Sequence, residues 1–405
     1  MTPNPGEKTA LKLKCLQDIA VKSKRVLLRV DYNVPVKSGK VTDNSRIRET
    51  LPTLKHLIEQ GAKVAVISHF GRPKGKPDPQ YSLKPVAAEL EDLLKIPVAF
   101  STDCVGPDAQ KVAAGLKNGG IALMENLRFH AGEEANDPDF AKALSKLGTV
   151  FVQDAFGALH RAHASTAGVP KFLPGAIGFL VQKELEFLDR VIGNPARPFL
   201  AIIGGAKVSD KLGVLNKLLD RVDAMVIGGG MAYTFLSAQG ISVGKSLLEK
   251  DKVQEAQSVV EKAYAKKVQC LLPADHLAVR EIRPDADVTV TQAMAIPADL
   301  IGVDIGPHSI EFFTEEIAKA KTIFWNGPMG IFEIEAFSKG SLAVAQAMAQ
   351  ATGKGAVTIV GGGDSLAVLS KTGLANKMTH CSTGGGASLE LLEGKILPGL
   401  EALAS

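Results

Sequence analysis

Short apolar segments rich in β-branched residues alternate with helical patterns along almost the whole chain, and this alternation constrains the fold more than any other feature. The strand candidates of the first half are RVLLRV (25–30), KVAVIS (63–68), IALM (121–124) and VFVQ (150–153). Between the first two, residues 46–60 place Ile47, Leu54 and Ile58 at helical spacing before Gly61 ends the helix. Repeated strand–helix–strand units predict parallel sheets flanked by helices.

The length of the chain, 405 residues, predicts two domains rather than one ordinary core. The segment VPKFLPGAIG (169–178), with two prolines and two glycines, marks the boundary. Residues 178–193 follow as one amphipathic pattern, which predicts a helix that connects the domains. We therefore expect an α/β fold of two Rossmann-like three-layer domains with parallel sheets, 1–177 and 194–395, joined by an interdomain helix and separated by a cleft.

Composition excludes several classes of protein. Hydrophobic residues make up 45% of the chain and charged residues 22%, as in a globular enzyme. With 5% aromatic residues and one tryptophan, a stacking surface for nucleic acid is not expected. The four cysteines are far apart and are predicted to be free thiols in a reducing compartment. Residues 1–14 lack a signal-peptide core and no apolar run approaches about 20 residues, so we expect a soluble cytoplasmic protein without a membrane partner.

The loops after the first-half strands lead to arginine. These loops are RVDYNVP (29–35), SHFGRP (68–73), ENLRFH (125–130) and DAFGALHRAHAS (154–165). Ligands bind beyond the carboxyl ends of the strands in such sheets, so we expect the arginines to converge at that edge. The arginines are Arg46, Arg72, Arg128 and Arg161. Because guanidinium groups bind carboxylate or phosphate in a fork, this edge is predicted to hold a small anion.

Other polar residues of these loops are candidate ligand contacts. Asp31 and Asn33 can accept hydrogen bonds from hydroxyl groups, although Asp-x-Asn is also common in plain turns, and His69 is a candidate donor. His160 and His163 suggest a metal site. Without nearby cysteines or a third clear ligand, we favour hydrogen-bonded histidines that line a basic pocket.

In the second half the strand candidates end in glycine. They are LAIIGGAK (200–207), AMVIGGG (224–230), AVTIVGGGD (356–364) and HCSTGGG (380–386). Glycine after a strand lets backbone N–H groups face a phosphate with no Cβ in the way. Lys207 and Lys211 are four apart, which predicts one face of a helix that begins after a glycine turn and binds a polyphosphate. Asp364 is placed to meet Mg²⁺ carried by that polyphosphate.

Two other classes of function compete with this interpretation. A NAD-dependent dehydrogenase would need a G-x-G-x-x-G turn after a strand, which is absent, and GISVGKS (240–246) lacks the spacing of a Walker A loop. A non-catalytic two-domain binding protein is disfavoured by Lys207, Lys211 and Asp364 together. The residues alone thus indicate a two-domain phosphotransferase for a small anion.

The ordered motifs resemble those of the phosphoglycerate kinase family. Besides the four first-half loops, they are GGAKVSDK, IGGGMAYTF, VDIGP, WNGPMGIFE, GGGDS and STGGGASLELLEGK, and together they run from residue 29 to 395. The resemblance implies reversible, in-line phosphoryl transfer between 1,3-bisphosphoglycerate and MgADP, giving 3-phosphoglycerate and MgATP in glycolysis. Another two-domain phosphotransferase with a carboxylate acceptor is excluded only by this resemblance.

The resemblance also implies a role for each motif residue. The phosphoglycerate contacts would be Asp31, Tyr32, Asn33, Arg46, His69, Phe70, Gly71, Arg72, Arg128 and Arg161. The nucleotide contacts would be Gly205, Ala206, Lys211, Gly229, Gly230, Gly302, Val303, Asn326, Pro328, Glu333, Gly361, Gly362, Gly363, Asp364 and Ser365, with Mg²⁺ on Asp364 as the only cofactor. Residues 396–405 would return to the first domain.

A carboxylate acceptor is already ionised at neutral pH, so the predicted mechanism needs no general base. We assign charge neutralisation in the transition state to Arg46 and Lys207, helped by backbone N–H groups near Gly363 and Gly386. Because the two ligands bind to different domains, we expect a hinge closure at the ends of the 178–193 helix. The partners would be small molecules, and a monomer is expected.

Overall fold

The computed structural model describes residues 11–404, and the chain divides into two compact units. Unit 1 comprises Met1–Glu186 and Ile396–Ser405, and unit 2 comprises Phe187–Lys395. The division falls inside the helix α6 (Phe179–Ile192), where the sequence predicts a connecting helix. The first ten residues, part of the segment in which no signal peptide is predicted, and Ser405 lie outside the described residues.

The described part of unit 1 holds a sheet of parallel strands in the order β5-β6-β4-β1-β7-β8. Their bounds are β1 (Arg25–Arg29), β4 (Lys63–Ile67), β5 (Val98–Ser101), β6 (Ile121–Met124), β7 (Val150–Gln153) and β8 (Gly175–Ile177). Val26 and Leu28 pack in the core formed with α1 and α2, while Leu27, on the other face of the sheet, is equally buried. Burial on both faces explains the nearly continuous apolar runs in the sequence.

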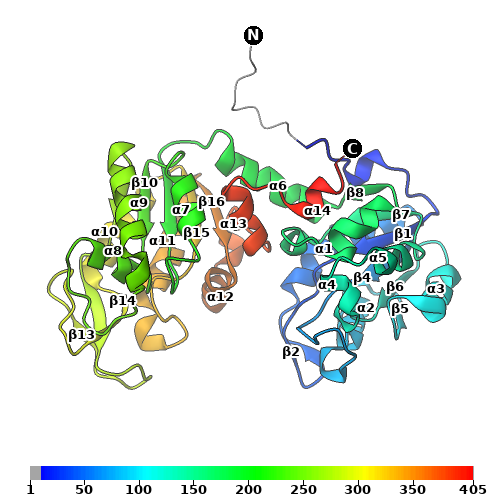
Figure 1. Ribbon diagram of the computed structural model, residues 1–405, viewed down its shortest axis with the longest axis horizontal. Helices are drawn as coiled ribbons and strands as arrows, with labels where there is room; N and C mark the ends of the chain where they lie inside the picture. The colour runs from blue at the N-terminus through cyan, green and yellow to red at the C-terminus, as the bar shows by residue number, and fades with distance from the viewer. Residues whose placement is uncertain (1–10, 405) are drawn as a thin grey trace, which may run out of the picture. The chain divides into compact units, whose positions relative to one another are not determined.

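Helices cover this sheet, and long loops, 30–44 and 68–83, connect β1 to α1 and β4 to α2 (Figure 1). The helices are α1 (Ser45–Glu59), α2 (Lys84–Leu94), α3 (Gly106–Gly115), α4 (Ala131–Glu134), α5 (Pro138–Ser145) and α14 (Pro398–Glu401). A small hairpin, β2 (Val36–Lys37) with β3 (Lys40–Val41), precedes α1. As predicted, α1 ends at a glycine: Gly61 has φ +68° and its N–H donates to the carbonyl of Ile58.

Unit 2 repeats this architecture with the strand order β11-β10-β9-β15-β16-β17 in its parallel sheet. The strands are β9 (Phe199–Ile203), β10 (Ala224–Ile227), β11 (Gln269–Leu271), β15 (Thr322–Asn326), β16 (Val357–Gly361) and β17 (His380–Cys381). The helices are α7 (Leu212–Leu218), α8 (Ala232–Ala238), α9 (Val253–Ala265), α10 (Pro307–Lys319), α11 (Lys339–Gly353), α12 (Gly363–Thr372) and α13 (Gly386–Leu392). The predicted α/β fold with two parallel sheets is confirmed.

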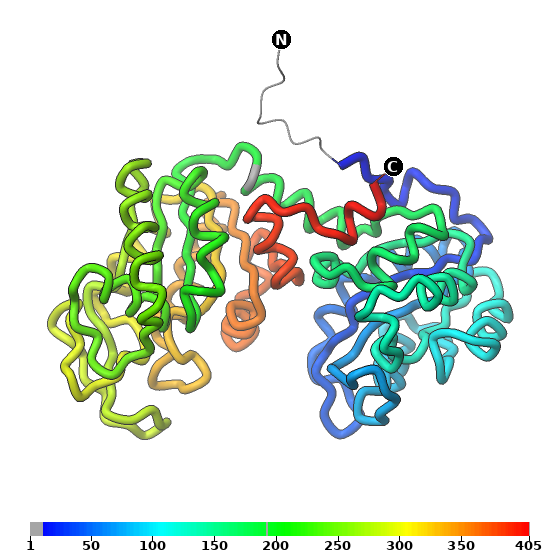
Figure 2. The backbone as a smooth tube through the Cα atoms, viewed as in Figure 1, coloured from blue at the N-terminus to red at the C-terminus, as the bar shows by residue number. Residues whose placement is uncertain are grey.

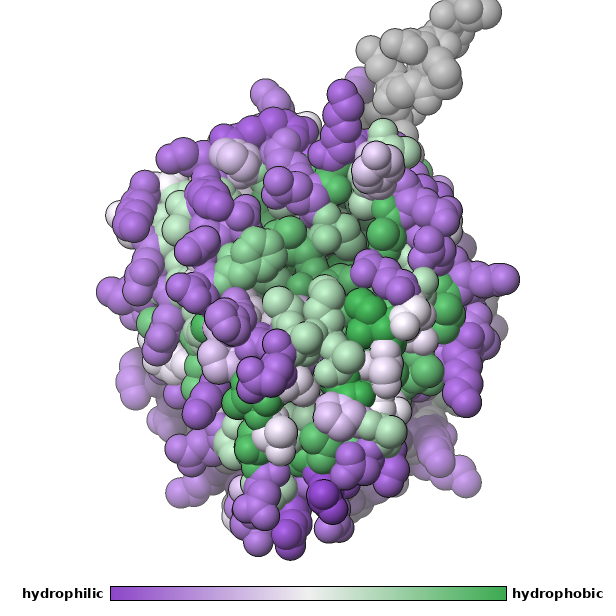
Figure 3. All heavy atoms as spheres, turned by 90° about the vertical axis from the view of Figure 1, so that its left-hand side faces the viewer, coloured by the Kyte–Doolittle hydropathy of each residue, from purple (hydrophilic) through white to green (hydrophobic). Residues whose placement is uncertain are grey.

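Unit 2 also contains an antiparallel sheet that the sequence patterns did not predict. It pairs β12 (His276–Val279) with β13 (Thr289–Val290) and β14 (Ile301–Ile305). Figure 3 shows a face of unit 2 on which apolar residues gather inside a polar rim. Val290 in β13 is 42% exposed and Phe312 in α10 is 38% exposed, so part of the apolar surface of this unit faces solvent.

The chain leaves unit 1 through α6, and its last described residues return to it (Figure 2). The N–H of Gly399 donates to the carbonyl of Leu159 at 3.0 Å, and a Cβ on Gly399 would lie 2.7 Å from the Leu159 side chain. The tail therefore packs closely on the loop that carries the DAFGALHRAHAS motif.

A buried carboxyl group anchors the start of α6 to unit 1. Asp154 Oδ1 accepts hydrogen bonds from the N–H groups of Leu180, at 2.9 Å, and Val181, at 3.2 Å. Burial raises the pKa of Asp154 to about 7, although hydrogen bonds from Thr53 and from these amides act in the opposite direction. Gly178 permits this approach, because a Cβ there would lie 2.3 Å from Asp154 Oδ1.

We predict that Asp154 gives unit 1 a pH-dependent stability. In the folded protein the carboxyl group keeps its proton up to about pH 7, whereas in the unfolded chain it loses the proton near its ordinary pKa of 3.8. The protonated Asp154 therefore adds to the free energy of unfolding at low pH, and this contribution is lost as the pH rises through about 7. Relative to Asp154→Asn, the wild-type free energy of unfolding should fall by up to about 4 kcal/mol between about pH 4 and pH 8.

Chemical denaturation followed by circular dichroism measures this difference. The exposed Asp92 provides the control, because Asp92→Asn should follow the wild-type pH profile. Parallel profiles for wild type and Asp154→Asn would show that the Asp154 carboxyl is not protonated by folding.

Candidate functional site

The loops after β1 and β4 meet around Asp31 at the carboxyl edge of the unit 1 sheet. Arg46 Nη1 lies 2.7 Å from Asp31 Oδ2, and His69 Nε2 lies 3.8 Å from Asp31 Oδ1. Asn33 Oδ1 accepts a hydrogen bond from the N–H of Gly71 at 3.0 Å. Burial alone would raise the pKa of Asp31, but His69, Arg46, the Asn33 amide and Arg29 together hold it below its ordinary value. The structure thus brings these predicted residues together around an ionised Asp31.

Arg128 joins this cluster from the neighbouring strand. It lies in the short turn Leu127–Phe129 after β6, and its Nη1 donates to the carbonyl of Gly71 at 2.7 Å. Its Nε is 3.1 Å from Glu134 Oε1, an ion pair without good hydrogen-bond alignment. Asn126 joins the two loops, because its Oδ1 accepts from the N–H groups of Phe70 and Arg128. Sequence reasoning missed Asn126, although an asparagine directly before a helical turn is a capping signal.

The other predicted phosphoglycerate contacts fall into two groups. Arg72 and Arg161 are exposed. Burial lowers the pKa of Arg128, and the positive charge of nearby Arg161 acts in the same direction. Tyr32 and Phe70 pack in the hydrophobic core, where the Tyr32 hydroxyl lies 2.8 Å from Thr50 Oγ1. Tyr32 is fully buried, and the backbone N–H of Phe70 donates to Asn126 Oδ1, so both residues are engaged within the fold.

A buried ionic network of Arg29, Glu133 and Ser165 packs against the residues of this sheet edge. Arg29 is fully buried, with Nε donating to Ser165 Oγ at 2.7 Å and Nη2 lying 3.1 Å from His69 Nδ1. Glu133, also fully buried, accepts from Ser165 Oγ at 2.6 Å and lies 3.9 Å from Arg29. Because a guanidinium only donates, His69 Nδ1 must accept, which leaves the imidazole hydrogen on Nε2, toward Asp31. Sequence reasoning missed this role of Arg29 because the residue reads as part of a strand.

His69 and His163 are neutral groups in a basic surrounding. Burial lowers the pKa of His69 well below its ordinary value, more than Asp31 raises it. Burial also lowers the pKa of His163 to about 4, and Arg29, Arg128 and Arg161 contribute in the same direction. Within residues 11–404, His160 and His163 belong to no group of three potential metal ligands.

In unit 2, the glycines after β9, β10 and β15 serve the close packing of three loops. The N–H of Gly205 donates to the carbonyl of Pro328, and that of Gly229 to the carbonyl of Met329, both at 3.0 Å. A Cβ on Gly229, where φ is +67°, would lie 2.6 Å from the Gly205 carbonyl oxygen. These two amides are thus bound to protein carbonyls, contrary to the expectation that glycine amides here face a phosphate. The predicted contacts Ala206, which is exposed, and Gly230 lie in the same loops.

The glycines at the starts of α12 and α13 are different. Gly363 is exposed, and a Cβ on Gly363 or on Gly385 would meet no atom within 4 Å. Asp364, in the first turn of α12, is exposed as well. The N-terminus of a helix favours anions through its free N–H groups and its dipole. These helix starts, with Gly361 and Gly362 before α12 and Gly386 in α13, therefore remain candidate positions for an anion.

The prediction that Lys207 and Lys211 share one face of a helix is wrong. The helix α7 begins only at Leu212, because Glu249 holds the preceding residues in a turn: its Oε2 accepts from the N–H groups of Val208, at 2.6 Å, and Ser209, at 3.1 Å. Lys207 is exposed in this turn. Desolvation raises the pKa of Glu249, but hydrogen bonds from Ser209 and Val208, with the charge of Lys207, hold it below its ordinary value.

Lys211 and Asn326 link the loop after β9 to the end of β15. Lys211 Nζ donates to Asn326 Oδ1. Burial lowers the pKa of Lys211, while Asp210 and Asp364 act in the opposite direction. Asn326 is 1% exposed, and its buried Nδ2 has no hydrogen-bond acceptor in the protein. A buried donor without an acceptor is costly, so Asn326 is suited to a ligand oxygen.

The remaining predicted nucleotide contacts lie around these loops. Glu333 is exposed, and Val303 is buried in β14. The N–H of Gly302 donates to Ser246 Oγ at 2.9 Å, and Ser365 Oγ accepts from the N–H of Gly327 at 2.6 Å. The side chain of Ser365 is therefore engaged within the fold.

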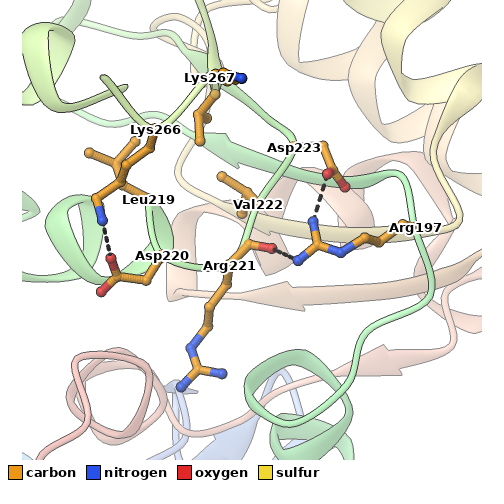
Figure 4. A pocket seen from close by; sticks show the side chains of 9 residues that line it. Arg197, Leu219, Asp220, Arg221, Val222, Asp223, Lys266 and Lys267 are labelled. Atoms are coloured by element: carbon orange, nitrogen blue, oxygen red, sulfur yellow. Dashed lines mark hydrogen bonds and ion pairs between the residues drawn. The ribbon is translucent and has the colours of Figure 1, made fainter. Parts of the chain in front are cut away.

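A separate basic pocket lies at the opposite, amino-terminal edge of the unit 2 sheet (Figure 4). It has a volume of about 490 Å³ and is lined by residues before β9, β10 and β11. Arg197 pairs with Asp223 at 2.6 Å and Lys266 with Asp220 at 2.7 Å. Two of the four cationic residues that line this pocket are thus paired with carboxylates.

Two further sequence expectations concern the whole chain. All four cysteines are free thiols, as predicted. Among the described residues no helix is both long and apolar enough to span a membrane.

Each of the two units is an α/β fold with a parallel sheet. One sheet has a cationic edge and the other an edge of glycine, lysine and aspartate, and this combination defines a two-domain phosphotransferase. The model of the phosphoglycerate kinase family matches residues 16–395. A phosphoglycerate kinase of Elusimicrobium minutum is 55% identical over 393 residues, covering 97% of this chain and 98% of the relative. A cytosolic phosphoglycerate kinase of Triticum aestivum is 52% identical over 390 residues, covering 96% and 97%.

Solved structures agree. The phosphoglycerate kinase of Coxiella burnetii superposes with a TM-score of 0.86 at 44% identity, covering 97% of this chain and 100% of that one. That of Pyrococcus horikoshii OT3 has a TM-score of 0.85 at 35% identity, covering 96% and 98%. The chain belongs to the phosphoglycerate kinase family.

We expect an added methyl group to destabilise the protein at the packed Gly229 but to have little effect at the open Gly363. Gly229→Ala should destabilise unit 2 by at least about 2 kcal/mol, because the Cβ meets the Gly205 backbone and the backbone is left-handed. Gly363→Ala should change stability by less than about 1 kcal/mol. Trp325 is the chain's one tryptophan and is buried in unit 2, so its fluorescence during urea unfolding reports both values. Equal destabilisation by the two substitutions would contradict this distinction.

Proposed function

We propose that the protein is a glycolytic enzyme that transfers a phosphoryl group reversibly between 1,3-bisphosphoglycerate and MgADP, giving 3-phosphoglycerate and MgATP. The observation that carries the proposal is the separation of two site types: Arg46, His69 and Arg128 gather near Asp31 in unit 1, while Lys211 and Asn326 meet at the glycine edge of unit 2. Family membership over residues 16–395 supports it.

The unit 1 edge is proposed to bind the phosphoglycerate. Its phosphate and carboxylate would be held by Arg46, Arg72, Arg128 and Arg161. The neutral imidazole of His69 offers an N–H donor at Nε2, and the ionised Asp31, with Asn33, can accept from the hydroxyl group. Each charge-assisted hydrogen bond contributes roughly 1.5–3 kcal/mol.

The unit 2 edge is proposed to bind the nucleotide. Lys211, the Nδ2 of Asn326 and the N–H groups at the start of α12 would bind its phosphates. The nucleoside would contact the loops around Gly205, Gly229, Gly302 and Pro328, with Glu333 at the ribose. Asp364 fits Mg²⁺, because it presents an exposed carboxylate, a hard oxygen ligand, next to the proposed phosphate position. The ion would neutralise phosphate charge.

Phosphoryl transfer is proposed to be catalysed by neutralisation of the phosphate charge and not by proton transfer. The carboxylate acceptor is ionised at neutral pH, so alignment and charge neutralisation supply the catalysis. Arg46, which is partly exposed beside Asp31, and the exposed Lys207 are proposed to stabilise the phosphoryl group in flight, with the N–H groups near Gly363 and Gly386. Transfer is direct, without a phosphorylated enzyme.

A coupled assay of 3-phosphoglycerate-dependent ATP consumption tests the proposal, and helix α1 offers a matched pair of variants. Arg46→Ala should lower kcat/KM at least about 30-fold, because roughly 2 kcal/mol of charge-assisted bonding is lost. Arg48 is exposed on the same helix and bonds only to Asn44 in the described structure, so Arg48→Ala should stay within about twofold of wild type. No ATP consumption by wild type, or equal losses in both variants, would reject the assignment.

We also propose that the protein works as a cytoplasmic monomer on small molecules and that its units close on both ligands, with hinges at the ends of α6. Small-angle scattering should show a smaller radius of gyration with MgADP and 3-phosphoglycerate together than with either alone, and the mass of one chain. Unchanged dimensions in the ternary mixture would argue against closure, and a doubled mass against a monomer.

A further inference from the structure

A cluster of three potential metal ligands lies at the carboxyl ends of β5 and β6 in unit 1. The strands β5 and β6 are parallel neighbours, with Ser101 opposite Met124 at their carboxyl ends. The loop after β5 carries Asp103 and Cys104, and the loop after β6 carries His130. The strand pairing therefore brings together an oxygen, a sulfur and a nitrogen ligand from two separate loops.

The geometry is close to that of one metal ion. The three potential ligand atoms all lie within 4.8 Å of one another, and His130 Nε2 is 2.7 Å from Asp103 Oδ1. Ligand atoms around a tetrahedral Zn²⁺ lie roughly 3.3–3.8 Å apart, so small side-chain rotations suffice. Cys104 is 1% exposed, whereas the side chains of His130 and Asp103 are 33% and 45% exposed. The cluster has a buried thiol and an open side through which an ion can enter.

The surrounding structure holds the ligands in place. The His130 ring stacks on Phe140 with centroids 5.1 Å apart and an interplanar angle of 29°. Asp103 Oδ1 accepts from the N–H groups of Cys104, at 2.6 Å, and Val105, at 3.3 Å, and Ser101 Oγ donates to the Asp103 carbonyl. Such supporting contacts orient metal ligands and reduce the cost of ordering them.

We propose that Asp103, Cys104 and His130 form a binding site for Zn²⁺ or a similar borderline-soft divalent cation. The ion would take the place of the hydrogen shared by His130 Nε2 and Asp103, and the thiol would bind as thiolate after releasing its proton. Three protein ligands of mixed type with an open fourth position for water suit Zn²⁺. Mg²⁺ is excluded here, because it requires oxygen ligands in octahedral geometry.

This site is distinct from the proposed Mg²⁺ position at Asp364, which is in the other unit, and does not depend on the proposed function. Burial raises the pKa of Cys104 well above its ordinary value, with the charges of Asp103 and Glu133 adding to it.

Cobalt titration of the reduced, chelator-treated full-length protein tests the inference. Co²⁺ should bind with 1:1 stoichiometry and produce a thiolate-to-cobalt charge-transfer band in the near ultraviolet, and Zn²⁺ should abolish the band while excess Mg²⁺ should not. Cys104→Ser should remove the band, and His130→Gln should weaken Co²⁺ binding at least about 30-fold. Cys270→Ser and Cys381→Ser are the matched controls and should keep the wild-type band.

Circular dichroism of the metal-free variants checks folding. If Cys104→Ser does not fold, His130→Gln provides the test instead, because His130 is partly exposed, and weaker Co²⁺ binding is the expected result. Absence of a charge-transfer band in wild type, or a band that survives in Cys104→Ser or is lost in Cys381→Ser, would overturn the assignment.

Discussion

In unit 1, β1, β4 and β7 end at Arg29, Ile67 and Gln153, which lie opposite one another in the parallel ladder. The loops that leave these strands therefore start at one level, and charged residues far apart in the sequence emerge side by side. Unit 2 shows the same constraint, with Ile203 opposite Asn326. A shift of this register by one residue would turn the buried strand residues to the other face and separate the loops.

The two sheet edges are stabilised by different physics. Unit 1 holds its charges through the buried network of Arg29, Glu133 and Ser165, in which each ionic group has a hydrogen-bonded or charged partner. Removal of one partner would leave a buried charge at a cost of about 3–5 kcal/mol. Unit 2 instead packs backbone against backbone, and Gly205 and Gly229 permit the contact. The arginine-lined edge of unit 1 is thus stabilised by buried groups of opposite charge, while the glycine-lined edge of unit 2 is stabilised by close packing of its loops.

The sequence predicted many of the parallel strands, but not the edge strands β5 and β8 or the contacts between the elements. The runs at 121–124 and 150–153 coincide with β6 and β7, because buried parallel strands show as continuous apolar segments. The short strands β12 and β13 were missed, since a few residues in an antiparallel sheet give no clear period. Lys207 was placed on a helix that begins only at Leu212, because the turn depends on Glu249, distant in the sequence.

The candidate site shows the same limit. Arginine and glycine after strands could be predicted, because parallel strands deliver their loops to one edge. The hydrogen bond that sets the tautomer of His69 could not, since Arg29 lies inside a strand. The acceptor-free amide of Asn326 was equally invisible, because burial of one side-chain atom depends on the packing of several loops.

A crystal structure with 3-phosphoglycerate and a magnesium nucleotide bound together tests the central claim most directly. The account predicts phosphoglycerate density on Arg46, Arg128 and His69 of unit 1, and nucleotide phosphates at Lys211 and the start of α12 in unit 2. Both molecules on one unit, or an arginine cluster that binds neither of them, would contradict it.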